Sequence, residues 1–356
     1  SIHHMATQRK LIEYLHQCFF SPPPSTIIKA VKNDQLLGVP GFSLQAIKKW
    51  LPISTATIKG HLHRVRKNIR STQKHKPDPE YERDMHPPED KNAECIMYCY
   101  AAIAEEFNNT IYSDATGKFP VPSIHGNKYV MIFYVYDANA ILVRAIKNRE
   151  KETMLKTFHN VYDYLIKRKL TPKLHVMDNE CSKLLSTYIE QEKNTKIQFV
   201  EPHQHRVNAA EHAIQIFKNH FIAGLCTAHP QFPLALWCEL LPHAELTLNL
   251  LRQARSNKRL SAYAMLEGEF NFDRTPLAPP GTKALVFDDP RQRTSWAPHA
   301  KDAWFIGPAL RHYRCFRFYV PATKGITVAQ TVKNFPSFTT TPTLTNKEYA
   351  ILTARE

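Results

Sequence analysis

The chain of 356 residues carries 47 lysines and arginines against 32 aspartates and glutamates, so its formal charge is 47 − 32 = +15, and a folded chain this basic indicates a polyanionic partner, with nucleic acid as the leading candidate. Its seven scattered cysteines favour reduced thiols in an intracellular protein over a disulfide framework. No apolar run reaches the roughly 18 residues of a transmembrane helix, so no membrane partner is expected.

Residues 1–70 are predicted to form an all-helical module. Residues 9–20 repeat apolar side chains at helical spacing, and a proline triplet follows them. The segments 43–51 and 54–68 have the outline of a helix-turn-helix whose second helix is basic. An ordinary pair of surface helices would look similar, and this alternative stays open. If the helix-turn-helix is genuine, we expect it to contact DNA through Lys59, Arg64 and Arg66.

Residues 71–94 change to proline, histidine and mixed charge, which is typical of an extended linker. Residues 95–258 then alternate strand and helix patterns. Residues 95–106 are apolar and fit a helix or a strand. The run at 129–136 is apolar throughout, and Ala210, Ile214, Phe217 and Phe221 repeat at the spacing of one helix face. Three strand-like runs precede helix, strand, helix, strand and helix, at 109–113, 129–136, 141–146, 150–167, 174–177, 182–192, 197–200 and from about 209, with a last helix at 233–252. This is the element order of a ribonuclease H-like α/β fold.

Residues 259–338 change to short strands separated by turn residues, at 281–287, 303–306, 315–320 and 325–328. This pattern predicts a small β-barrel domain. Basic and aromatic side chains on these strands make the barrel a candidate DNA-binding platform, although aromatic residues would equally serve as its core. Residues 339–356 are expected to form a tail.

Three acids occupy positions that suit a metal site. Asp114 and Asp178 each end a strand-like run, and Glu211 lies on the helix that follows the fifth strand. Three carboxylates from two strands and one helix can hold a pair of Mg²⁺ ions for phosphoryl transfer. Taken singly, each acid has an ordinary alternative as a turn cap, a helix cap or a solvated side chain. Their joint position is therefore what carries the prediction.

Several motifs around these acids carry a family resemblance. They are SDATGKFP at 113–120, GNKY at 126–129, MDNE at 177–180, PHQHRVNAAE at 202–211, and later WAPH at 296–299 and GPA at 307–309. With them the chain resembles the integrases of copia-type long-terminal-repeat retrotransposons over most of its length. The resemblance implies a ribonuclease H-like core in which Asp114, Asp178 and Glu211 form the catalytic triad. It also implies two Mg²⁺ or Mn²⁺ ions, a homo-oligomer on double-stranded DNA, and 3′-end processing followed by strand transfer into target DNA.

The sequence departs from the family pattern in two respects. Between the last two acids there are 211 − 178 − 1 = 32 residues, fewer than is usual, and Ala209 stands near a usual glycine. The Cys-x-x-Cys pair that binds zinc in the family's N-terminal module is absent from the sequence. The remaining donors have spacings poorly suited to a zinc site on helices, so we expect no Zn²⁺ there. These donors are His16, Cys18, His61 and His63.

Further DNA contacts are expected around Glu211. Gln215 and Lys218 lie one and two turns further along the same helix face, near a terminal base and a phosphate, although Lys218 would also suit an ordinary solvated lysine. His205 and Arg206, in the preceding loop, would add phosphate contacts. Two alternatives remain for the whole chain: an integrase-derived DNA-binding protein without catalysis, and a ribonuclease H-like nuclease. An integrase would work in the nucleus after a cytoplasmic particle stage.

Overall fold

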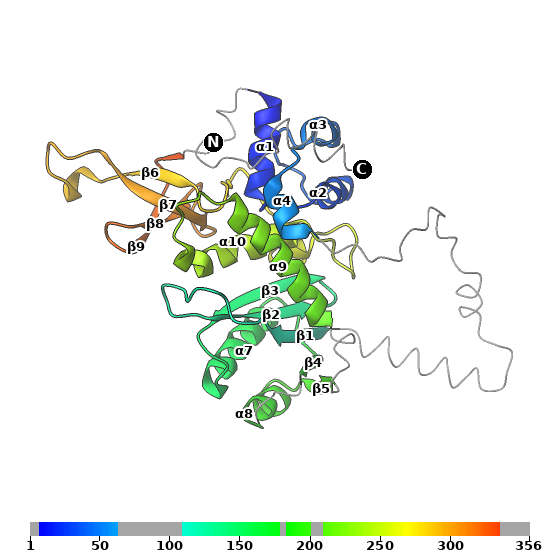
Figure 1. The fold of residues 1–356 in the computed structure, drawn as a ribbon. Coiled ribbons are helices and arrows are strands. Elements are labelled where there is room, and N and C mark those ends of the chain that lie inside the picture. Colours follow the sequence, from blue (N-terminus) through cyan, green and yellow to red (C-terminus); the bar gives the residue numbers. More distant parts are fainter. Residues whose placement is uncertain (1–6, 63–108, 179–182, 201–208, 335–356) are drawn as a thin grey trace, which may run out of the picture.

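The computed structural model describes residues 7–62, 109–178, 183–200 and 209–334. A group of helices comes first in the chain, followed by a mixed sheet with its helices and then a second sheet (Figure 1). This part of the chain is therefore a mixed α/β protein with two five-stranded sheets. The predicted linker at 71–94, the possible element at 95–106 and the predicted tail lie outside the described residues.

The first sheet has the strand order β3-β2-β1-β4-β5. Strands β1, β2 and β3 pair antiparallel, whereas β4 is parallel to β1 and β5 is parallel to β4. Helix α7 connects β3 to β4, and α8 with the π-helical turn η2 connects β4 to β5. The five strands agree with those expected from the sequence to within a few residues. The bounds are β1 Thr110–Ala115, β2 Tyr129–Val135, β3 Ala140–Ile146, α7 Lys151–Ile166, β4 Leu174–Asp178, α8 Lys183–Thr187, η2 Tyr188–Glu192 and β5 Lys196–Val200.

Helices cover both faces of this sheet (Figure 1). On one face, Phe158 of α7 meets Phe133 of β2 with ring centroids 4.9 Å apart. The other face is covered by α9 (Ala209–Thr227) and α10 (Trp237–Leu250), which a short 3-10 turn, η4 (Leu234–Leu236), precedes. Because β2 is covered on both sides, it is apolar along its length. The residues predicted to share one face of α9 are all buried against the sheet: Ala210, Ile214, Phe217 and Phe221.

The N-terminal helices pack onto the outer side of α9 and α10 (Figure 1). Leu15 of α1 belongs to the same buried cluster as Leu246 and Leu250 of α10. Helix α4 approaches α9 so closely that a Cβ added at Gly60 would lie 2.6 Å from the carbonyl oxygen of Asn219. The apolar periodicity of this region thus serves to attach it to the sheet-bearing part of the chain. The bounds are α1 Gln8–Cys18, α2 Pro24–Lys32, α3 Leu44–Trp50 and α4 Thr55–His61.

At Gly224, helix α9 lies in close contact with the side chain of Phe20. A Cβ added there would lie 1.8 Å from Cδ1 of Phe20, and Phe20 is itself fully buried against His220 and His243. Gly224→Ala is therefore expected to lower the free energy of unfolding by about 3 kcal/mol through overpacking. Chemical denaturation measures this change. Gly117→Ala is the matched control, because nothing lies within 4 Å of a Cβ added at Gly117, and equal losses in the two variants would contradict the packing.

The second sheet is antiparallel, with the order β10-β6-β7-β8-β9. Phe305 and Phe318 are fully buried at its centre. Strands β9 and β10 are the two edges of this order, so closure into a barrel stays a prediction. Helix α11 (Ala262–Glu267) lies at the start of the range assigned to the β-barrel domain, where no helix was predicted, and Ser261 caps it by accepting a hydrogen bond from the Ala264 N–H at 3.0 Å. The bounds are β6 Lys283–Phe287, β7 Ala300–Pro308, β8 Phe316–Val320, β9 Gly325–Ala329 and β10 Val332–Asn334, with the 3-10 turn η5 at Pro290–Gln292.

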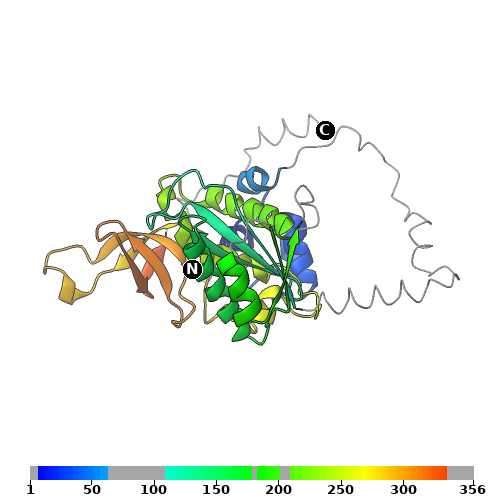
Figure 2. The same ribbon diagram turned by 90° about the horizontal axis from the view of Figure 1, so that it is seen from below.

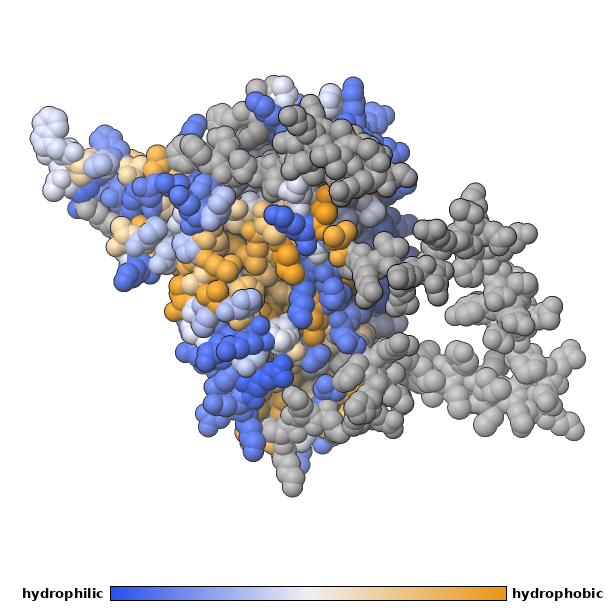
Figure 3. Space-filling view, in the orientation of Figure 1, coloured by the Kyte–Doolittle hydropathy of each residue, from blue (hydrophilic) through white to orange (hydrophobic). Residues whose placement is uncertain are grey.

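The second sheet extends away from the side of the helical layer (Figure 2). On the face seen in Figure 3, hydrophobic side chains gather over α10 and hydrophilic side chains cover α7. Leu234 and Leu310 are among the exposed hydrophobic residues, at 42% and 47% of their full accessibility. None of the helices in the described ranges combines the length and the apolar character needed to cross a membrane.

Candidate active site

Two acids lie side by side where the central strands end. Strands β1 and β4 are parallel neighbours, and their register, continued by one residue, sets Asp114 beside Asp178. Neighbouring strands lie roughly 4.8 Å apart. Tyr112 and Val176, two residues earlier on the same strands, belong to the core beneath α9. Because side chains alternate along a strand, both acids start from the face of the sheet that α9 covers, and at the ends of their strands they also border a cavity on the α7 side.

Glu211 joins these acids from the first turn of α9. Ala210 and Ile214 are buried against the sheet and fix this end of the helix, while Glu211 itself is exposed. Its negative charge contributes to the raised pKa of Asp114, which places the two carboxylates within electrostatic reach of each other. The structure therefore brings the three predicted acids to one region.

Asp114 is the member of this group whose ionisation is perturbed. Burial raises the pKa of the Asp114 carboxyl above its ordinary value, and the charges of Asp178 and Glu211 raise it further. The N–H of Ala115, which donates to Asp114 Oδ1 at 2.6 Å, and the guanidinium of Arg149 oppose the shift. Burial together with the charges of the other two acids outweighs these opposing partners, so the net shift is upward.

A divalent cation suits this group of ligands. Carboxylate oxygens are the ligands that Mg²⁺ and Mn²⁺ prefer, and a cation among them would offset their mutual repulsion. Among the described residues, one group of His, Cys, Asp or Glu has ligand atoms that all lie within 4.8 Å of one another, and it consists of His125, Cys238 and Glu239. The carboxylates of Asp114, Asp178 and Glu211 do not form such a group, so they are spaced more widely than the ligands of a closed metal site. The donor chemistry of the three acids therefore fits Mg²⁺, in an open arrangement.

A cavity of about 310 Å³ opens beside the acids. Asp114 and Asp178 line it together with two cations, Arg149 and Lys151, which lie just before and at the start of α7. Arg149 donates to the carbonyl oxygen of Thr116 at 3.1 Å, which holds it near the end of β1. Neither cation was predicted from the sequence. Their one signal was a pair of basic residues where the third strand gives way to a helix.

The predicted DNA-contacting residues fall into two groups. Gln215 and Lys218 are exposed on α9, and the Gln215 side-chain amide donates to Asn219 Oδ1 at 2.9 Å. Lys59 is exposed on α4, close enough to α9 for its charge to act on Cys226. The other four, His205, Arg206, Arg64 and Arg66, lie outside the described residues.

Two of the candidate N-terminal metal donors, His16 and Cys18, are engaged in other interactions. Nε2 of His16 lies 2.9 Å from the carbonyl oxygen of Pro22, and burial lowers the pKa of His16 to about 4. Cys18 is fully buried, interacts with Tyr14, and has its thiol pKa raised by burial. His61 is the C-terminal residue of α4, and His63 lies outside the described residues.

The group of His125, Cys238 and Glu239 escaped sequence analysis, because a loop and a distant helix bring it together. Glu239 accepts hydrogen bonds from His125 Nε2 at 2.8 Å and from Arg317 at 2.7 Å. Burial raises the pKa of the Cys238 thiol, which disfavours the thiolate that metal binding requires. We interpret the group as a structural junction that links the β1–β2 loop, α10 and β8.

Glu239→Gln tests this junction. The Glu239 and Arg317 side chains are only 12% and 27% exposed, so losing the charge of Glu239 is expected to lower the free energy of unfolding by about 1–2 kcal/mol. Asp302→Asn is the matched control, because the Lys283–Asp302 pair on the same sheet is 41% and 67% exposed and should contribute almost nothing. Equal effects in urea denaturation would contradict a role for Glu239 as a junction.

Comparisons with known proteins were made for the whole chain. No protein-family model matches the sequence, and no curated protein matches it. Among solved structures, the chain is similar to a chain in the cryo-EM structure of the simian T-cell lymphotropic virus intasome in complex with the PP2A regulatory subunit B56 gamma. The sequence identity is 11% and the TM-score is 0.34, over 64% of this chain and 81% of that chain.

Proposed function

We propose that this chain is an integrase-type enzyme that cuts and joins DNA by metal-dependent phosphoryl transfer. The observation that carries the proposal is the convergence of Asp114 and Asp178, at neighbouring strand ends, with Glu211 on the helix that covers them. The strand order β3-β2-β1-β4-β5, with its acids on β1, on β4 and at the start of α9, supports a ribonuclease H-like core.

The chain's own residues would position the DNA. Asp114, Asp178 and Glu211 would hold the cations, and Arg149 and Lys151 at the cavity would attract the scissile phosphate. Gln215 and Lys218 are exposed on the helix that carries Glu211, where they can contact the flanking nucleotides. Bound Mg²⁺ ions supply activation of an attacking water or DNA 3′-hydroxyl and stabilisation of the leaving oxygen.

Oligonucleotide assays test this function directly. The full chain is incubated with labelled duplex DNA and Mg²⁺ or Mn²⁺, and we expect nicked and strand-transfer products that disappear with EDTA. DNA binding without any product would favour the integrase-derived binding protein. Cleavage without joining would favour the ribonuclease H-like nuclease.

Asp114→Asn tests the electrostatics of the site. Because the folded-state pKa of Asp114 is raised, its ionised form lowers stability at every pH above that pKa, and the penalty disappears as the pH falls through it. At pH 7 without metal, the substitution removes a charge that burial, and to a smaller extent the neighbouring acids, disfavour. It is therefore expected to raise the free energy of unfolding by up to about 1 kcal/mol, since partial exposure to solvent limits the effect. Thermal unfolding in EDTA measures the change.

The same variant reports metal binding. Mg²⁺ at ten times its Kd is expected to stabilise the wild-type chain by about 1.4 kcal/mol and to stabilise Asp114→Asn less. Glu192→Gln is the control, because Glu192 is an exposed acid on η2 that lies outside the group of three. If Mg²⁺ stabilised all three proteins equally, Asp114 would not be a ligand.

We further propose that the chain works as a homo-oligomer on double-stranded DNA in the nucleus. The hydrophobic surface over α10 supports a protein partner at the face seen in Figure 3. Light scattering of the full chain with and without duplex DNA tests the assembly. A monomer under both conditions would contradict it.

A further inference from the structure

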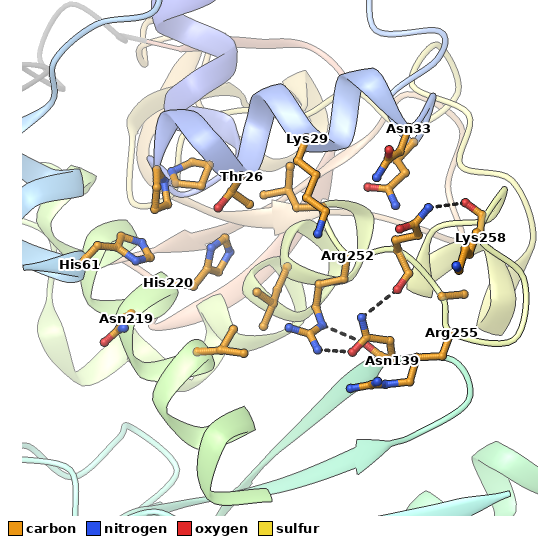
Figure 4. Close-up of a pocket in the computed structure, with 18 residues that line it drawn as sticks. Thr26, Lys29, Asn33, His61, Asn139, Asn219, His220, Arg252, Arg255 and Lys258 are labelled. Carbon is orange, nitrogen blue, oxygen red and sulfur yellow. Dashed lines mark hydrogen bonds between the residues drawn. The ribbon is translucent and has the colours of Figure 1, made fainter. Parts of the chain in front are cut away.

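A second cavity, of about 520 Å³, lies where the N-terminal helices meet the sheet-bearing part of the chain (Figure 4). Helix α2 forms one side, α9 and the end of α10 form another, and the segment after α10 closes it together with Asn139 from the β2–β3 turn. Its lining is different from that of the cavity beside Asp114. Its volume is that of a small-molecule site.

The charge of this cavity is one-sided. Four cations line it, and among the described residues no aspartate or glutamate does. Lys29 reaches in from α2 toward the side on which Arg252 lies, while Arg255 and Lys258 come from the segment after α10 (Figure 4). Within the same described ranges, none of the four forms an ion pair with an acid. Among the residues that the structure describes, no acid therefore compensates the positive charges of the cavity.

Arg252 carries most of this imbalance, because its guanidinium is largely buried. It donates from Nε to the carbonyl oxygen of Asn139 at 2.7 Å and from a terminal nitrogen to Asn139 Oδ1, both neutral acceptors. Burial lowers the pKa of Arg252, Tyr134 partly opposes this shift, and the nearby charge of Arg255 adds to it. Arg255 in turn donates from Nε to the hydroxyl of Tyr134 at 3.0 Å. Burying a guanidinium without a negative charge beside it raises the electrostatic free energy of the folded chain, and a bound anion would make this electrostatic term favourable.

We propose that this cavity binds the phosphate groups of a phosphorylated ligand, and that it does so independently of the metal-dependent site at Asp114. A guanidinium matches two phosphate oxygens in a planar arrangement, and lysine ammonium groups add point charges around them. Thr26 and Asn33 of α2 add neutral hydrogen-bonding groups, and Leu248 and Leu251 give an apolar wall for the organic part. A free polyphosphate or nucleotide and a DNA strand share this phosphate chemistry.

The test uses inorganic pyrophosphate, ATP and a short oligothymidylate as probes, all in EDTA so that no metal site takes part. Calorimetric titration of the full chain is expected to show binding of at least one of these probes. Lys29→Gln combined with Lys258→Gln should weaken it by roughly tenfold or more, because two charge-assisted contacts are lost. Both lysines are exposed, so the double variant is expected to fold. Lys32→Gln is the matched control, since Lys32 is an exposed lysine on α2 outside the cavity.

The pattern of binding identifies the source of the phosphate. Pyrophosphate or ATP binding that the double variant weakens, and that Lys32→Gln leaves within twofold, supports a small phosphorylated ligand. Oligothymidylate binding alone, with the same sensitivity, supports a DNA strand that enters the cavity. Absence of binding of all three probes, or equal weakening by the double variant and by Lys32→Gln, would overturn the proposal.

Discussion

Asp178→Asn is expected to lower the rate of DNA nicking and strand transfer about 10²–10³-fold while leaving the chain folded. The substitution keeps the size of the side chain at the end of β4 but removes the charge with which it would hold a cation beside Asp114. Losing one preorganised group that stabilises charge in a transition state costs about 10²–10³ in rate, or roughly 3–4 kcal/mol. Single-turnover assays with saturating protein separate this loss from weaker DNA binding.

Two further measurements make this prediction specific. DNA affinity in EDTA should stay within a few-fold of wild type, because Asp178 contributes negative charge and no contact that attracts phosphate. Glu192→Gln, which removes an exposed acid after β4, should keep the wild-type rate. If wild type and Asp178→Asn had the same nicking and joining rates, the acids would be structural and the enzymatic proposal would be wrong.

The second large effect expected is a loss of stability in mild acid. His16, His175, His220 and His243 are at most 2% exposed, and burial lowers the pKa of His16 to about 4 and of the other three to about 3. Below about pH 6.5 the unfolded chain binds protons at these sites, whereas the folded chain binds them only near pH 3–4. Stability is therefore fully present above pH 6.5 and falls as the pH decreases through this window.

The size of this effect follows from the number of histidines. Each contributes about 1.4 kcal/mol per pH unit inside the window, which covers about 1.5 units between pH 6.5 and pH 5. Going from pH 7 to pH 5 is therefore expected to remove about 8 kcal/mol for the four histidines together. That is comparable to the whole stability of many domains. Denaturant unfolding at a series of pH values measures the slope.

Single substitutions assign the slope to the buried histidines. His243→Gln should make the slope shallower, because the neutral amide takes up no proton, even though it also changes the packing against Phe20. His299→Gln should leave the slope unchanged, since His299 is exposed. A wild-type stability that is flat between pH 7 and pH 5 would show that the buried histidines do not control acid unfolding.

Much of the secondary structure was predictable because deeply buried strands and helices carry a clear spacing of apolar residues. The run of apolar residues in β2 and the helical spacing of Ala210, Ile214, Phe217 and Phe221 were each identified from the sequence, and each is buried as expected. Helix α11 was missed because it has only six residues, too few for an apolar period to emerge. Its clearest signal, the cap provided by Ser261, depends on one residue.

The residues of the two cavities also divide into those that a local sequence pattern identifies and those that only tertiary packing brings together. Asp114 and Asp178 were identified because each ends an apolar run, so their strands can be assigned locally. Arg149 and Lys151 were missed because they reach the acids only when α7 folds back over the sheet. No local pattern connects Lys29 with Arg252 either, since they meet only after α2 packs near the end of α10.

By itself the sequence determined the charge of the chain, the order of its main helices and strands, and the residue types that suit metal-dependent chemistry, because each of these depends on composition or on side-chain spacing within a short segment. Only the tertiary structure decided which charges share a cavity and which stand apart. It set Asp114 beside Asp178, gathered four cations around a cavity that no acid of the described residues lines, and attached the N-terminal helices to α9. The physical reason is that electrostatic interaction depends on distance through space and on burial, and neither is encoded in any local stretch of the chain.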